Sequence, residues 1–134
     1  MHYMLDTNIC IYLIKQHPPQ VLARLQTLVQ GDVVMSVVTY AELRAGLEIQ
    51  DANRAQDERV LSMLIHRIPV LPFTSANAEC FGILRAAVRD RRHDTMDRLI
   101  AAHAVNVGAT LVTNNEADFK GYPGLTIENW ALPV

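Results

Sequence analysis

Short apolar runs alternate along this chain with longer segments in which apolar residues recur every three or four positions. Residues 3–5, 33–36 and 110–113 have the length and apolar character of buried strands. Weaker strand candidates lie at 68–73 and 125–127. Helical spacing predicts helices in the intervening segments: one ending near Lys15, then 21–29, 39–48, 53–67, 75–90 with Ser75 as its N-cap, and 96–107. This alternation predicts an α/β fold with a mostly parallel central sheet flanked by helices.

The composition is that of one globular domain spanning residues 1–134. Half of the residues are hydrophobic and 19% are charged, and the chain is long enough to bury a substantial core. No apolar run approaches the roughly 20 residues that span a bilayer, and no signal-peptide pattern is visible, so we expect a cytoplasmic protein. Cys10 and Cys80 form no CxxC pair and lie in apolar or helix-like contexts, so we expect reduced core thiols rather than a disulfide. The histidines show no HExxH spacing, which argues against a histidine-bound zinc site.

Charge is distributed unevenly, although the net charge is only −2. The stretch from Arg85 to Arg98 carries five arginines and three aspartates. A solvated helix end is the simplest explanation of this pattern. The more specific alternative is a basic rim of the site that contacts nucleic-acid phosphates.

Acidic residues recur at one end of the predicted strands. Asp6 ends the first strand, and Glu42 lies early in the helix after the second. Asp97 begins a helix that must run antiparallel to strand 110–113, and Asn115 and Asp118 follow that strand. Because the carboxyl ends of parallel strands lie along one edge, we expect these side chains to converge there.

Each acid also has a simpler explanation. Asp6 could cap the following helix, and Thr39-x-x-Glu42 fits a capping box. Asp97 would gain about 0.3–1 kcal/mol from a helix dipole, and Asp118 could be a surface loop residue. A cluster of carboxylates in apolar sequence nevertheless requires protons or a cation. Oxygen ligands favour Mg²⁺ or Mn²⁺, ions that support phosphodiester hydrolysis.

Four sequence blocks resemble PIN-domain ribonucleases, most closely the VapC toxins of bacterial toxin–antitoxin pairs. The blocks are MLDTN (4–8), TYAELRAG (39–46), MDRLIAAHA (96–104) and LVTNNEADF (111–119). The resemblance covers nearly the whole chain and implies a single PIN domain with an α/β/α sandwich. It also implies Mg²⁺-dependent endonucleolytic cleavage of RNA that leaves 5′-phosphate and 3′-hydroxyl ends.

The family's acidic site can be placed on this chain residue by residue. Asp6, Glu42 and Asp97 match its three most dependable carboxylates. The fourth position is often Asp in relatives and is Asn115 here, with Asp118 the nearest acid. The resemblance implies that Asp6 and Asp97 hold the principal Mg²⁺, for which Mn²⁺ can substitute, with Glu42 a direct or water-mediated ligand.

Supporting roles follow from the same resemblance. Asn8 would orient the carboxylates and Thr113 would hold a water on the metal. Asp94 stands where many relatives have a small residue. Flanking RNA phosphates would be anchored by nearby arginines, of which the candidates are Arg89, Arg91, Arg92 and Arg98.

The resemblance also implies partners. The substrate would be a structured RNA, typically a tRNA, with initiator tRNA favoured by close relatives and the anticodon region as the cleavage site. The chain would form a homodimer and bind a VapB antitoxin, meeting DNA only through that antitoxin and no membrane. The antitoxin helix would lie in an apolar groove, for which residues 9–14 and 21–29 are candidate walls, with packing in the core the alternative for both.

Two other functions compete with the ribonuclease. A phosphotransferase could use Asp6 as an aspartyl nucleophile, but such enzymes commonly need a second acid where Asn8 stands. A non-catalytic RNA- or partner-binding module of the same fold is the other alternative. RNA binding that persists in EDTA without cleavage in Mg²⁺ would favour that module.

Overall fold

A five-stranded parallel sheet organises the chain, and a computed structural model describes residues 2–49, 52–89 and 95–132. The strand order is β3-β2-β1-β4-β5, and every neighbouring pair is parallel. The strands are β1 (Tyr3–Leu5), β2 (Val33–Ser36), β3 (Val70–Leu71), β4 (Thr110–Val112) and β5 (Ile127–Glu128). The α/β class with a parallel sheet, predicted from the alternation of apolar runs, is confirmed.

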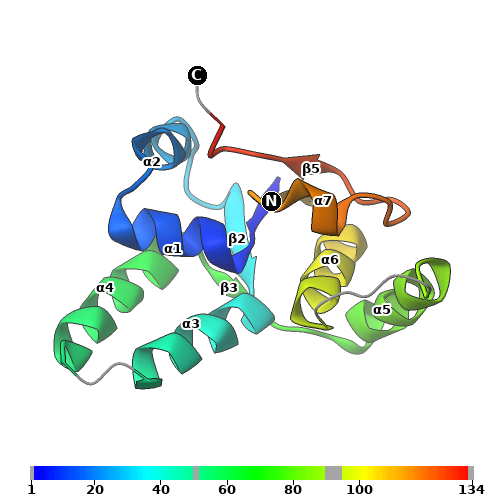
Figure 1. Ribbon diagram of the computed structural model, residues 1–134, viewed down its shortest axis with the longest axis horizontal. Coiled ribbons are helices and arrows are strands. Elements are labelled where there is room, and N and C mark those ends of the chain that lie inside the picture. Colours follow the sequence, from blue (N-terminus) through cyan, green and yellow to red (C-terminus); the bar gives the residue numbers. More distant parts are fainter. Residues whose placement is uncertain (1, 50–51, 90–94, 133–134) are drawn as a thin grey trace.

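Helices cover both faces of this sheet (Figure 1). α1 to α4 lie on one side of the strands, and α5 and α6 lie on the other. The helices are α1 (Thr7–Lys15), α2 (Pro19–Gln26), α3 (Val37–Ile49), α4 (Arg54–Arg67), α5 (Ser75–Ala87), α6 (Thr95–Val107) and α7 (Glu116–Phe119). Among the described residues, no helix combines the length and the apolarity needed to cross a bilayer.

Some element boundaries differ from the sequence predictions. Helix α5 is capped by Thr74 rather than Ser75, because Thr74 and Asn77 form a reciprocal capping box. The helix ends at Ala87 instead of continuing to residue 90, and β5 begins at Ile127, two residues later than expected. The four-residue helix α7 was not predicted, since so short a segment carries no periodic signal.

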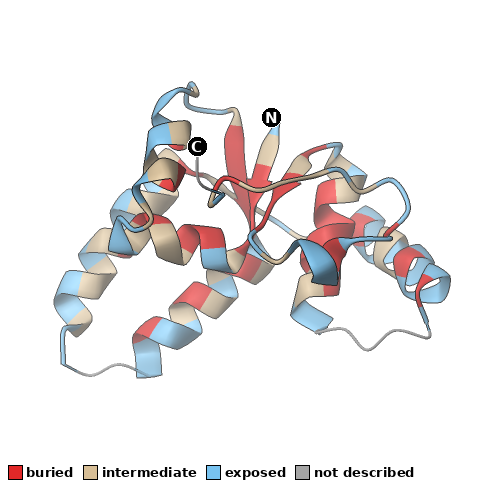
Figure 2. Cartoon of the chain, turned by 45° about the horizontal axis from the view of Figure 1, so that its top comes forward, coloured by how far each residue is buried: buried red, intermediate tan, exposed pale blue. Residues whose placement is uncertain are grey.

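Alternating side chains of the strands divide the core into two layers. Leu5, Met35 and Val112 pack with α1, α2, α3 and α4. Their strand neighbours Met4 and Leu111 face the opposite way and pack with α5 and α6. The strands are therefore buried on both faces, which explains why they read as continuous apolar runs (Figure 2).

The turn between α6 and β4 determines which end of α6 reaches the carboxyl edge of the sheet. Gly108 follows α6 with a φ of +74°, a left-handed conformation that glycine adopts without steric cost. Its N–H donates to Val105, and the N–H of Ala109 donates to Ala104, which completes the helix end. The chain then reverses into β4, so Asp97 at the other end of α6 lies beside the carboxyl end of β4.

Candidate active site and metal centre

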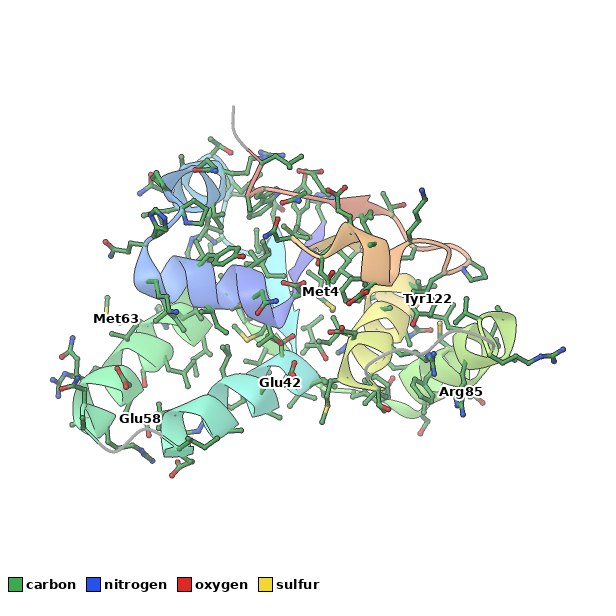
Figure 3. The ribbon with its side chains drawn as sticks, viewed as in Figure 1. Met4, Glu42, Glu58, Met63, Arg85 and Tyr122 are labelled. Carbon is green, nitrogen blue, oxygen red and sulfur yellow. The ribbon has the colours of Figure 1, made fainter. Side chains whose placement is uncertain are left out.

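The acidic residues gather at the carboxyl edge of the central strands. Asp6 directly follows β1, and its N–H donates to the carbonyl of Val112 at the end of β4. In Figure 1 the first turns of α1, α3 and α6 come together in the middle of the molecule, and Figure 3 shows Glu42 there on α3. The topology thus brings residues from distant parts of the chain to one place.

A cavity of about 340 Å³ opens between these elements. Its described lining consists of carboxylates, carboxamides and one hydroxyl: Asp6, Thr7, Asn8, Glu42, Asp97, Asn115 and Asp118. The structure therefore brings together the acids, Asn8 and Asn115, all of which were candidates from sequence. Of the candidates, Thr113 is buried behind this lining and contacts Asp6.

Asp6 is a buried carboxylate, with only 4% of its surface exposed. Burial raises the pKa of Asp6, hydrogen bonds from Thr113 and the N–H of Ile9 oppose this, and the charge of Glu42 raises the pKa further. The bond from Ile9 is 3.0 Å long, so Asp6 does cap α1 as the simpler explanation expected. The cap leaves the Asp6 carboxylate on the cavity wall. Asp6 therefore both caps α1 and lines the cavity.

Glu42 is held by a residue that sequence analysis missed. The hydroxyl of Thr7 donates a hydrogen bond to the Glu42 carboxylate, which joins α1 to α3. The capping box proposed for Thr39 and Glu42 is wrong, because α3 begins at Val37 and Thr39 lies inside it. The sequence shows that Thr7 stands next to Asp6. It does not show that Thr7 bonds Glu42, because that contact depends on tertiary packing.

The β4–α7 connection supplies the remaining side of the cavity. The amide side chain of Asn115 donates to the carboxylate of Asp118 at 2.5 Å. The Asn115 N–H donates to the hydroxyl of Thr113 at 2.9 Å, which holds the residue against the end of β4. Asp97, half-buried in the first turn of α6, faces the same cavity.

The donor chemistry of the cavity fits a hard divalent cation. Its described lining offers carboxylate and amide oxygens, and it includes no His or Cys. Oxygen ligands of this kind are the ones that Mg²⁺ and Mn²⁺ prefer. Within residues 2–49, 52–89 and 95–132, however, no three His, Cys, Asp or Glu side chains are grouped as tightly as metal ligands. Two of the carboxylates also accept hydrogen bonds from other residues of the lining, Glu42 from Thr7 and Asp118 from Asn115. Such hydrogen bonds orient a carboxylate and leave it lone pairs with which to ligate a cation.

The arginines expected to contact RNA differ in their placement. Arg89 is exposed just beyond α5. Arg98 is only 5% exposed, and its Nε donates to the hydroxyl of Tyr122 at 3.3 Å. Its side chain is turned into the fold rather than toward solvent, which corrects its assignment as a surface phosphate contact. Arg91 and Arg92, together with Asp94, lie outside the described residues.

A second cavity, of about 390 Å³, lies beside the acidic one. Its lining is largely apolar and comes from α1, α3 and α4: Ile11, Ile14, Lys15, Glu42, Leu43, Gly46, Leu47, Asp57 and Leu61. Glu42 lines both cavities. Of the two segments expected to wall the antitoxin groove, residues 9–14 contribute Ile11 and Ile14 to this lining, whereas Val21 and Leu25 of α2 are buried in the core.

The sheet and its cavity define a parallel α/β protein with an acidic site at the carboxyl ends of its strands. Comparison with known proteins identifies the family within this class. The PIN domain profile matches residues 3–125, which is most of the chain. The chain belongs to the PIN-domain family and, within it, to the VapC group.

Similarity to individual members extends over nearly the full length of both chains. The tRNA(fMet)-specific endonuclease VapC of Shigella flexneri is 38% identical over 133 residues, covering 98% of this chain and 99% of that protein. Ribonuclease VapC2 of Rickettsia felis is 35% identical, covering 97% and 98%. The crystal structure of VapBC2 from Rickettsia felis bound to a promoter DNA fragment matches with a TM-score of 0.89 and 34% identity, covering 97% of this chain and 99% of that one.

Proposed function

We propose that this chain is the toxin of a VapBC-type pair and acts as a metal-dependent endoribonuclease. The observation that carries the proposal is the cavity shared by Asp6, Glu42 and Asp97, in a chain that is 38% identical to a tRNA(fMet)-specific endonuclease. A tRNA is the proposed substrate, with initiator tRNA and its anticodon region the specific expectation. Because tRNA is found in the cytoplasm, we propose that this protein acts there.

The chain's own residues would divide the work of the site. Asp6 and Asp97 would hold Mg²⁺, and Glu42 would ligate it directly or through a water. When bound, Mg²⁺ supplies positive charge to the scissile phosphate and lowers the pKa of the attacking water. Asn8 and Thr113 would orient the carboxylates and the water.

The remaining polar groups would position the substrate. Asn115 and Asp118 would close the side of the cavity formed by the β4–α7 connection. Water attack on phosphorus with cleavage of the P–O3′ bond leaves a 5′-phosphate and a 3′-hydroxyl. Arg89, together with Arg91 and Arg92, would anchor flanking phosphates, since the acids alone repel RNA.

The apolar groove supports a proposal about the partner. A VapB-type antitoxin would lay an amphipathic helix against Ile11, Ile14 and Leu47, because three helices already supply apolar walls there. Glu42 connects this groove to the acidic cavity, so a basic side chain of the antitoxin could reach the carboxylates. We also propose a homodimer, with promoter DNA contacted only through the antitoxin.

The test is cleavage of tRNA by the purified chain in Mg²⁺, in EDTA, and after Asp97→Asn substitution. We expect fragments with 5′-phosphate and 3′-hydroxyl ends in Mg²⁺ alone, with no cleavage by the variant. Sequencing of the fragment ends reports the substrate and the cleavage position together. RNA binding that persists in EDTA, with no cleavage in Mg²⁺ or Mn²⁺, would instead favour the non-catalytic binding module.

A further inference from the structure

Two buried polar side chains outside the acidic cavity form a hydrogen bond between the sheet and α6. Ser36 ends β2 and His103 lies in α6, 67 positions apart in sequence. Their Oγ and Nδ1 atoms are 2.7 Å apart, and the residues are 0% and 1% exposed. Neither is among the described residues that line the cavity. Burying two polar groups costs free energy unless they find hydrogen-bond partners, so breaking this bond inside the core would be costly.

The same serine also holds the beginning of α3. The N–H of Val38 donates to Ser36 Oγ at 3.1 Å, which fixes the turn from β2 into the helix. Ser36 therefore joins the start of α3 to α6 through His103. The ring of Phe73 meets the imidazole edge-on, with centroids 5.5 Å apart, and limits its rotation. Burial lowers the pKa of His103, which keeps the imidazole neutral near pH 7.

The two helices that meet at this joint carry two of the cavity acids. Glu42 lies six residues beyond Ser36, and Asp97 lies six residues before His103. Six residues of helix rise about 9 Å, so the backbone of Asp97 lies about 9 Å along α6 from His103, and Glu42 lies in the second turn of α3, which follows Ser36. The first turns of α3 and α6 approach each other in Figure 1, and both acids line one cavity.

This arrangement makes the joint a sensitive determinant of the cavity geometry. A rotation of about 6° at a joint roughly 9 Å away displaces a carboxylate by about 1 Å. Displacements of about 1 Å in catalytic groups can reduce rates by about 100-fold.

We propose that the Ser36–His103 hydrogen bond is a positioning pair that fixes the separation of Glu42 and Asp97, and thereby sets divalent-cation affinity and turnover. The proposal rests on the proposed function, because it assigns this pair to the same metal site. Ser36 and His103 are positioning residues and touch neither cation nor RNA.

The experiment compares His103→Leu with His103→Asn in the full chain. Leu removes the bond, whereas the Asn amide can occupy the place of Nδ1 and restore a partner for Ser36. Mn²⁺ affinity is measured by calorimetry, kcat and KM by tRNA cleavage, and folding by thermal denaturation. We expect His103→Leu to weaken Mn²⁺ binding and lower kcat by about tenfold or more, with KM little changed. His103→Asn should recover most of both losses.

Two further variants keep the test decisive. Ser36→Ala removes this bond together with the one from Val38, so it should lower Mn²⁺ affinity at least as much, even where His103→Leu fails to fold. Asn77→Ala is the matched control, because Asn77 is 1% exposed and caps α5 away from the cavity. It should lower the unfolding temperature and leave Mn²⁺ affinity unchanged.

The outcomes separate the two proposals. Folded His103→Leu and Ser36→Ala proteins with wild-type Mn²⁺ affinity and kcat would overturn the positioning pair, as would a loss limited to thermal stability. Wild-type protein that cleaves no RNA would overturn the proposed function, and the Mn²⁺ titrations would then decide on the pair by themselves.

Discussion

The hydroxyl of Thr7 donates a hydrogen bond to the carboxylate of Glu42, 35 positions away in sequence. Thr7 is the first residue of α1, directly after Asp6 caps that helix. The cap therefore orients two cavity residues together, because it fixes the Asp6 carboxylate and directs the adjacent hydroxyl toward α3. The bond therefore fixes Glu42 relative to Asp6, although α3 follows β2 and α1 follows β1.

We predict that Thr7→Val reduces RNA cleavage by about tenfold or more. Valine matches the shape of threonine but cannot donate, and a hydrogen bond to a charged group contributes about 1.5–3 kcal/mol. A loss of that size corresponds to a factor of about 10–160 in rate. The measurement is kcat/KM on tRNA. Thr7→Ser, which keeps the hydroxyl, should retain most activity, and equal losses in both variants would contradict the hydrogen-bonding role.

Asp6→Asn should abolish cleavage and Mn²⁺ binding while the protein stays folded. Asparagine can still accept the hydrogen bond from Ile9 and cap α1, but it removes the buried negative charge. Cleavage assays, Mn²⁺ calorimetry and circular dichroism measure the three properties. A well-folded variant with wild-type cleavage would remove Asp6 from the site.

Asn115→Asp should tighten Mn²⁺ binding and lower the unfolding temperature of the metal-free protein. The amide that donates to Asp118 would become a second carboxylate, and like charges at this distance repel. A divalent cation would offset the repulsion, so added Mn²⁺ should raise the unfolding temperature more in the variant than in the wild type. Thermal denaturation with and without Mn²⁺ tests this, with Asn106→Asp, an exposed position at the opposite end of α6 from Asp97, as the control.

The stability of the fold should fall in acid partly through His103. Burial lowers the pKa of His103 below its ordinary value of 6.5, so between these two pKa values the unfolded chain binds more protons than the folded one. The contribution is fully present above pH 6.5 and is lost as pH falls through the folded pKa. Urea unfolding at pH 7.5 and 5.5 should show a larger loss for wild type than for His103→Asn. Equal losses would mean that the imidazole titrates as it does in the unfolded chain.

The sequence by itself determined the parallel α/β class and the edge at which the acids meet. Apolar runs such as 33–36 are readable because strands buried on both faces contain few polar residues. The convergence of Asp6 and Asp97 follows from parallel strands joined by helices, a rule that needs no side-chain detail.

Only the tertiary structure decided which side chains bond one another. The partners of Glu42 and Ser36 lie 35 and 67 positions away, and no local pattern marks them. The burial of Arg98 against Tyr122 was equally invisible, since a charged residue on a helix reads as solvent-facing. Periodicity records which face of an element is apolar, whereas hydrogen-bond partners depend on how elements pack in three dimensions, and that packing sets the geometry of the cavity.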